Sequence, residues 1–231
     1  MSAAPPCAAV RSSLLDGLEP AQRAALSAHL RPREYKRGQV VFNNGETGDC
    51  MHLLQSGRVD VQLTTIEGHT IILRVVQPGE FFGEMALVHA DSKRIGRVCA
   101  LEPTKTYALY RRDFEAVRDQ HPALDRMLVA ALAERVAMTS RLAVELLMPP
   151  EPRLWRRLAM LADEYGDQPI RMSQDELAHT AGTVRQTASR VLNEGVRRGI
   201  ITVDRCTIRV VDRAALERMS RCADAKARLT E

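Results

Sequence analysis

The sequence predicts an α+β protein in which a small antiparallel β-barrel or sandwich is followed by a long helix and a C-terminal winged helix-turn-helix. Three observations predict this fold. Between Tyr35 and Tyr110, short runs rich in Val, Ile, Leu and Thr alternate with turn residues. The stretch from Ala123 to Met148 contains no Gly or Pro and is long for one helix of a small domain. Further on, SQDELAHTAGTVRQTASRVL has the pattern of two helices joined by a glycine turn.

The N-terminal part is expected to begin with a helix over Leu14–Leu30, because Pro20 suits a helix start and apolar residues follow at helical spacing. Strands are expected in the runs QVVF, MHLLQ, VDVQLTTI, TIILRVV, RVCAL and KTYALY, with turns in NNGETGD, SGR, EGH and PGE. A short helix is expected in RRDFEAVRDQHPAL, ending near Pro122.

The long helix carries apolar residues near one stripe, at Leu124, Leu128, Leu132, Val136, Leu142 and Leu146. One interpretation is a helix packed along its own barrel. The other is a dimer seam, because a helix of this length leaves apolar surface beyond a small barrel. We favour the seam and therefore expect a homodimer.

The stretch PPEP at Pro149–Pro152 is expected to interrupt the chain and to mark a domain boundary. The predicted division is residues 1–122 for the N-terminal helix and barrel, 123–148 for the long dimerisation helix, and 149–231 for the winged helix-turn-helix. Within the last part, a first helix is expected over Arg153–Tyr165.

Two capping boxes are expected in the C-terminal motif, one formed by Ser173 with Glu176 and one by Thr183 with Gln186. Gly182 lies in the turn between the helices, where glycine adopts backbone angles that other residues resist. The small or apolar residues expected to face inward are Leu177, Ala178, Ala181, Ala188, Val191 and Leu192.

The outward face of the second helix presents long donors and acceptors suited to base edges and phosphates: Arg185, Gln186, Ser189, Arg190 and Asn193. The segment from Val196 to Val211 is predicted to form a β-hairpin and contains four arginines against one aspartate. A solvated polar helix face is the alternative, but it does not explain the caps, the turn glycine and the clustered arginines together. The sequence therefore predicts double-stranded DNA as a partner.

Composition is that of an ordinary globular protein, with 45% hydrophobic and 27% charged residues and a net charge of +4. No apolar run reaches the length of a membrane span, and the start MSAAPPCAAVRSSLL lacks the features of a secretory signal. Five scattered cysteines without C-x-x-C favour a reducing cytoplasm. Because no metal-ligand spacing, nucleophile elbow or Walker loop is found, neither a metal nor an enzyme activity is expected.

The stretch GEFFGEMALVHADSKR at Gly79–Arg94 holds a carboxylate and an arginine near glycine turns, which predicts a pocket for a small anionic ligand. The chain from Leu14 to about Val211 resembles a regulator of the CRP/FNR family, with NNGETGD, LLQSGRVDV, PGEFFGEMAL and RQTASR at the expected places. The resemblance implies that the barrel is a cyclic-nucleotide-binding β-roll, and that RNA polymerase is a partner beside DNA and a second copy of the chain.

The resemblance also implies roles for single residues, with cyclic AMP as the effector. Glu84 would accept a ribose hydroxyl, and Arg94 would pair with the cyclic phosphate. Gly83 and Met85 lie in the same motif, and the backbone beside Gly83 would border the sugar and phosphate. The ligand-binding residues expected in all are Gly83, Glu84, Met85, Arg94, Thr139 and Ser140, the last two reaching the adenine. The DNA-binding residues are Arg185, Gln186, Ser189 and Arg190.

The family pattern R-[ST]-A is here Arg94-Ile95-Gly96, and the departure that matters is Ile95. Isoleucine has no side-chain donor for a phosphate, and one lost charge-assisted hydrogen bond costs on the order of 1.5–3 kcal/mol. A ligand-independent or redox-responsive regulator with the same fold is therefore an alternative, with Cys50, Cys99 or Cys206 as the thiol. A cyclic-nucleotide-binding adaptor or enzyme is a third hypothesis, which no catalytic motif supports.

Overall fold

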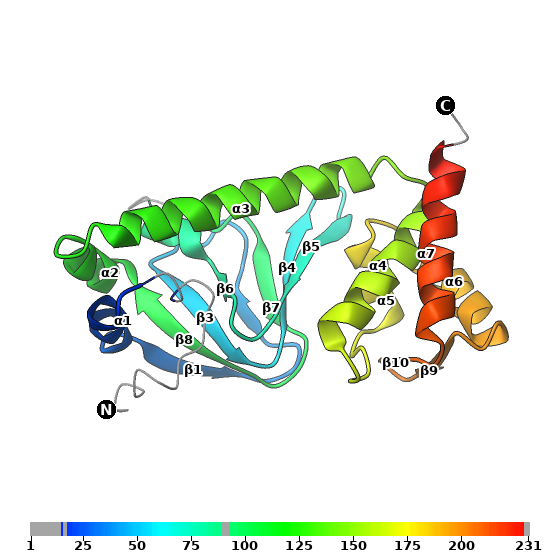
Figure 1. Cartoon of the computed structure of the whole chain (residues 1–231), viewed down its shortest axis with the longest axis horizontal. Helices are drawn as coiled ribbons and strands as arrows, with labels where there is room; N and C mark the ends of the chain where they lie inside the picture. Colours follow the sequence, from blue (N-terminus) through cyan, green and yellow to red (C-terminus); the bar gives the residue numbers. More distant parts are fainter. Residues whose placement is uncertain (1–14, 16–17, 89–92, 229–231) are drawn as a thin grey trace. The chain divides into compact units, whose positions relative to one another are not determined.

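The structure is a computed structural model that describes residues 15, 18–88 and 93–228. Its contacts divide the chain into two compact units (Figure 1). The first unit is Met1–Leu63 with Arg74–Met138, and the second is Thr64–Leu73 with Thr139–Glu231. The division falls inside the long helix, so it differs from the three segments expected from sequence, whose boundaries stay a prediction.

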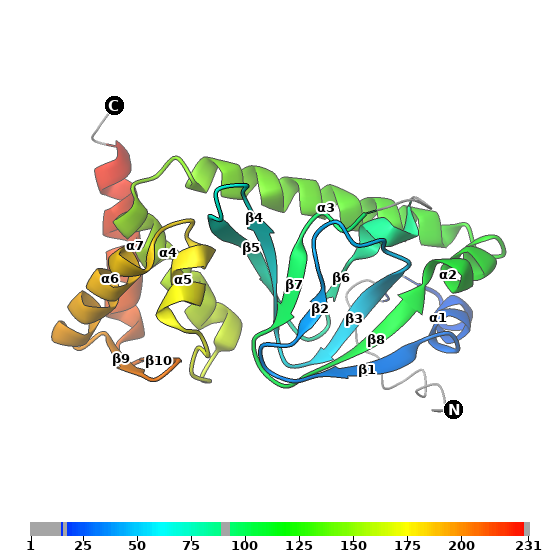
Figure 2. The ribbon, with the colours of Figure 1, turned by 180° about the vertical axis from the view of Figure 1, so that it is seen from behind.

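Strands β1 to β8 form two antiparallel four-stranded sheets (Figure 2). One sheet has the order β1 (Arg31–Tyr35), β8 (Thr104–Tyr110), β3 (Cys50–Ser56), β6 (Phe81–Phe82). The other has the order β2 (Val40–Phe42), β7 (Arg97–Ala100), β4 (Val59–Thr64), β5 (Thr70–Val76). Each of the six expected runs contains a strand. The buried residues that pack one part of this core are Leu54, Val59, Val76, Phe82, Val98 and Ala100.

Sequence reasoning missed two of these strands. Strand β1 has the sequence RPREY, with one proline and three charges, and it pairs with β8 at the edge of its sheet. An edge strand tolerates Pro and charge because one side of its backbone needs no partner. Strand β6 has only two residues, too few for a periodic signal.

Helices α1 (Pro20–Ser27) and α2 (Arg111–Arg118) pack against each other. The first is shorter than the expected span of Leu14–Leu30: it begins at Pro20, and Arg31 already belongs to β1. Leu14 lies outside the described residues. Between β6 and β7, the short helix η2 (Glu84–Leu87) begins at the predicted ligand motif.

Helix α3 (Ala123–Glu145) corrects the predicted stripe. Leu124, Leu128 and Ala131 are buried in the first unit's other core cluster, together with residues such as Met51 and Phe114. Packing on the barrel and a dimer seam therefore concern different faces of the helix. One face packs on the first unit, and the exposed apolar residues lie elsewhere on the helix. The large apolar side chains exposed along α3 are Val129, Val136 and Val144. The sequence stripe mixed these two faces.

From residue 150 onward, the described part of the second unit contains four helices and a hairpin (Figure 1). They are α4 (Pro150–Tyr165), α5 (Gln174–Thr180), α6 (Arg185–Arg197), β9 (Ile201–Asp204), β10 (Thr207–Val210) and α7 (Arg213–Arg228). The hairpin is the predicted wing, with Arg205 and Cys206 as its loop. Helix α7 was not predicted, although it packs extensively on α4.

The PPEP stretch begins α4, directly after the break that separates this helix from α3. Pro149 is the N-cap residue of α4, and Pro150 and Pro152 lie in its first turn, so the helix begins three residues before the expected start at Arg153. Proline is accommodated there because the first backbone N–H groups of a helix have no intrahelical partner and the proline φ suits the helix.

One of the two predicted capping boxes is confirmed. Ser173 Oγ accepts from the Glu176 amide at 3.1 Å, and the Glu176 carboxylate accepts from the Ser173 amide at 2.6 Å. The second prediction was wrong: the N-cap of α6 is Val184, which offers no side-chain cap. Gly182 has φ +54°, as the turn requires, and the residues expected to face inward are all buried.

Buried His52 gives the first unit a predictable acid sensitivity. Its ring stacks on Phe82 at 5.0 Å between centroids, and its Nδ1 lies 3.0 Å from Thr106 Oγ1. Burial, followed by the positive charges of Arg94 and Arg33, lowers the pKa of His52 to about 3. The native imidazole therefore stays neutral while the unfolded one, with a pKa of about 6.5, gains a proton as the pH falls.

We predict that His52 alone removes about 2 kcal/mol of stability between pH 7 and pH 5. The loss begins near pH 6.5 and continues until the native pKa near 3 is reached. Urea unfolding at both pH values checks this prediction. His52→Phe keeps the stacked ring and should lack this component, so an equal pH dependence in the two proteins would contradict it.

Candidate functional sites

Arg94 is held inside the first unit by backbone carbonyls. Its guanidinium donates to Cys50 O at 2.7 Å and to Gly83 O at 3.1 Å, and it lies over the Phe42 ring at 4.1 Å. Two glycines make room for it: a Cβ on Gly48 would meet Arg94 Nε at 2.8 Å, and one on Gly83 would meet a terminal nitrogen at 2.6 Å. Gly83 also has φ +77°, which disfavours any side chain there.

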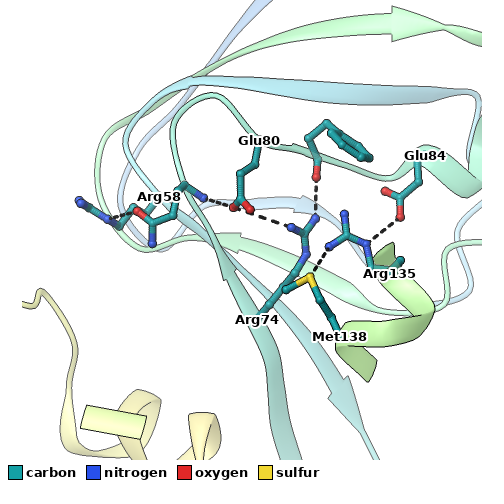
Figure 3. Close-up of polar contacts among 8 residues, drawn as sticks. Arg58, Arg74, Glu80, Glu84, Arg135 and Met138 are labelled. Atoms are coloured by element: carbon teal, nitrogen blue, oxygen red, sulfur yellow. Dashed lines mark hydrogen bonds and ion pairs between the residues drawn. The ribbon is translucent and has the colours of Figure 1, made fainter. Parts of the chain in front are cut away.

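Glu84, at the start of η2, is buried and already has a cationic partner. Arg135 Nε on α3 donates to Glu84 Oε1 at 3.2 Å, and its guanidinium lies 5.5 Å from the centre of the Phe81 ring (Figure 3). A second Arg135 nitrogen lies 3.9 Å from Met138 Sδ. A carboxylate bonded to a single guanidinium nitrogen retains acceptor capacity for a sugar hydroxyl.

Arg135 belongs to this cluster through its contact with Glu84, and sequence reasoning missed it. It lies four residues before Thr139, so both occupy the same face of α3. The helical spacing was therefore a usable signal. Together, Glu84, Arg94 and Arg135 offer one carboxylate and two guanidiniums around the Gly83 turn, a set that can hold a sugar phosphate.

The remaining predicted ligand residues take different places. Met85 on η2 is 41% exposed, and Ile95 is 61% exposed beside Arg94. Thr139 and Ser140 lie on α3 in the second unit and are exposed. Their contact with a ligand stays a prediction.

Other chemistry is sparse in the described part of the chain. A surface cavity of about 610 Å³ is lined by Arg31, Asp49, Tyr110, Arg111, Arg112 and Glu115, none of which was predicted to bind the effector. Among residues 15, 18–88 and 93–228, no three His, Cys, Asp or Glu side chains gather where a metal ion could be held. None of the helices searched there is long and apolar enough to cross a bilayer.

The second helix of the helix-turn-helix, α6, presents the polar face that sequence predicted. Arg185, Gln186, Arg190 and Asn193 are exposed, and Ser189 is half-buried. The opposite face is buried through Ala188, Val191 and Leu192. Packing therefore fixes which side of α6 is available to a partner.

Two of the arginines on this face are held by carboxylates of the same unit. Arg190 lies 2.5 Å from Glu151 on α4, and Arg185 lies 3.8 Å from Asp175 on α5. All four side chains are about half exposed or more, so these pairs are weak and can exchange for phosphate or base contacts. These guanidiniums can therefore leave their carboxylate partners at a small cost in free energy, because neither pair is buried.

Comparisons with known proteins agree with this two-part architecture. A family model for the cyclic nucleotide-binding domain matches residues 32–121, and one for the Crp-like helix-turn-helix domain matches residues 152–219. The chain is 32% identical over 212 residues to the cyclic AMP receptor protein of Thermus thermophilus, covering 90% of this chain and 97% of that protein.

Two further relatives support the same conclusion. A CRP-like cAMP-activated global transcriptional regulator of Mycobacterium tuberculosis is 26% identical over 219 residues, with 91% of this chain and 97% of the relative covered. The crystal structure of a CRP/FNR-family transcriptional regulator from Thermus thermophilus superimposes with a TM-score of 0.68 at 26% identity, covering 83% and 98% of the two chains. The fold and its two domains are those of a transcriptional regulator with a cyclic nucleotide-binding domain and a DNA-binding helix-turn-helix. The chain belongs to the CRP/FNR family.

Proposed function

We propose that this protein is a homodimeric, sequence-specific DNA-binding regulator whose affinity for its operator is controlled by a cyclic nucleotide. The observation that carries the DNA-binding part is the exposed polar face of α6, with Arg185, Gln186 and Arg190 projecting from a buried helix-turn-helix core. A symmetric dimer would place two such helices in major grooves about one helical turn apart, ~34 Å. RNA polymerase is the further partner that this role in transcription implies.

The effector part is supported by the residues around the Gly83 turn. Arg94 would pair with the cyclic phosphate and Glu84 with the ribose, while Arg135 adds a second cation. Thr139 and Ser140 would reach the base. Cyclic AMP is the first ligand to test, because two relatives are named for it. We expect the protein to act in the cytoplasm, where its DNA and nucleotide partners occur.

A second candidate keeps the fold and needs no ligand. This candidate is supported by the partners that both cations already have within the protein, because such cations need no bound anion. Arg94 donates to two backbone carbonyls, and Arg135 donates to Glu84. Ile95 adds no donor for a phosphate. A redox trigger has less support: burial raises the pKa of the Cys50 thiol, which disfavours the reactive thiolate at neutral pH.

The DNA-binding part is tested by selecting operators from a random duplex pool and measuring their affinity by fluorescence anisotropy. We expect Arg190→Ala to weaken the selected operator by about tenfold or more, because a bidentate arginine–base contact is worth ~1–3 kcal/mol. Arg221→Ala changes an exposed arginine of α7 and serves as the control. Equal effects of the two substitutions would contradict the assignment of α6 as the reading helix.

A further inference from the structure

Arg74 is a buried arginine inside the apolar strand run TIILRVV, and the proposed function gives it no role. It is 8% exposed. One terminal nitrogen donates to the Phe81 carbonyl at 2.5 Å, and the other lies 3.8 Å from the Glu80 carboxylate. Burial lowers the pKa of Arg74 to about 10, so the guanidinium remains charged at neutral pH. The Arg74 guanidinium is thus a buried, fully charged cation within the first unit.

This charge lies beside the predicted effector residues. Figure 3 shows the guanidiniums of Arg74 and Arg135 next to each other, between Glu80 and Glu84. The charge of Arg135 also contributes to lowering the pKa of Arg74, second only to burial. Glu80, Glu84 and Glu134 act in the opposite direction but do not cancel these two effects on the pKa of Arg74. Burying a cation beside a like-charged neighbour is costly, which favours a role in binding over a role in packing.

Arg74 and Arg94 approach the same short segment at different points. Arg94 contacts Gly83 O and Cys50 O, whereas Arg74 contacts Phe81 O on the side where Arg135 enters from α3. If Glu84 holds the ribose and Arg94 the phosphate, the base extends away from Arg94. The α3 side of the site, where Arg74 lies, is then the side that receives the base.

The chemistry of the guanidinium discriminates between purines. Arginine offers only donors. Guanine presents two acceptors, O6 and N7, along one edge, whereas adenine presents the N7 acceptor beside its N6 amino donor. A guanidinium facing that edge makes two hydrogen bonds with guanine, but it sets donor against donor with adenine.

We propose that Arg74 is a specificity-determining residue that makes the effector site prefer a guanine over an adenine cyclic nucleotide. This inference rests on the proposed cyclic-nucleotide function and concerns only the base. One bidentate arginine–guanine contact corresponds to a discrimination of roughly 5- to 150-fold.

Calorimetric titration of the full chain with cyclic GMP and cyclic AMP tests the proposal. We expect cyclic GMP to bind at least about fivefold more tightly. Arg74→Leu removes the donors and should reduce the ratio of the two dissociation constants by at least about fivefold. Arg74→Gln supplies both a donor and an acceptor, so it should also reduce the ratio and provides a milder variant if the leucine does not fold. Arg58→Gln is the control, because Arg58 is similarly buried but donates to Glu102 and Gln77, so the variant perturbs the neighbouring network while leaving the Arg74 guanidinium in place.

The outcomes separate this inference from the proposed function. A ratio that stays the same in both Arg74 variants, or affinities that fall by one common factor, would overturn the base-selective role and leave cyclic-nucleotide control intact. Tighter binding of cyclic AMP by the unchanged protein would overturn it as well. Failure of both nucleotides to bind the unchanged protein would overturn this inference together with the effector part of the proposed function.

Discussion

Val129→Glu is expected to convert the protein from a dimer into a monomer and to lower its affinity for a two-half-site operator by about a hundredfold or more. Val129 and Val136 are 65% and 67% exposed and seven residues apart on α3, and Val144 is 67% exposed further along. Residues seven apart share a helix face, and an exposed apolar stripe of this kind is typical of a two-helix seam. A glutamate at this position would place two like charges in the seam of a dimer. Each monomer would then bind one operator half-site independently.

Light scattering after size-exclusion chromatography and operator anisotropy measure the two effects of Val129→Glu. Glu134→Gln changes an exposed residue of the same helix outside the stripe and should leave both unchanged. A variant that remains dimeric at low micromolar concentration would contradict the seam on this face of α3.

Arg153→Met is expected to destabilise the second unit by about 3–5 kcal/mol. The guanidinium of Arg153 donates to Leu146 O at 2.7 Å and Met148 O at 2.9 Å, just after α3. It also donates to Ala181 O at 2.5 Å and Gly182 O at 2.9 Å, in the turn of the helix-turn-helix. The substitution leaves four carbonyls without this donor, because a methionine side chain has no N–H.

The effect of Arg153→Met can be followed on one unit. Trp155 is the single tryptophan of the chain and is buried in α4, so its fluorescence reports unfolding of the second unit. Arg156→Met, at a partly exposed arginine of the same helix, should cost less than about 1 kcal/mol. Similar urea midpoints for the two variants would show that Arg153 does not hold the turn.

The local spacing of apolar and polar residues predicted the strands and helices in which that spacing repeats over several residues. The six apolar runs became strands, the Ser173–Glu176 cap marked the start of α5, and the inward and outward faces of α6 followed from helical spacing. Strand β1 was missed because an edge strand does not need an apolar alternation. Helix α7 was missed although its sequence RAALERMSRCADAKAR is rich in strong helix formers, so a local signal was available.

The candidate effector site was predictable in part, for a different reason. The resemblance supplied Glu84 and Arg94, but it did not indicate that both are already bonded within the protein. Arg135 could have been found from its spacing to Thr139, and Arg74 from its charge inside an apolar strand. What sequence does not contain is the convergence of these guanidiniums on residues 81–84, because it depends on how β5, the segment before β7 and α3 meet.

Control of DNA binding by the roll is tested most directly by operator anisotropy with and without a saturating cyclic nucleotide. For the unchanged protein we predict that the ligand raises operator affinity about tenfold or more, since coupling energies between sites are typically ~1–3 kcal/mol. Glu84→Gln keeps the size of the side chain but removes its charge, and it should reduce this effect to less than about twofold at the same ligand concentration. Operator affinity that is the same with and without cyclic AMP or cyclic GMP, and unaffected by Glu84→Gln, would contradict control of the helix-turn-helix by a nucleotide.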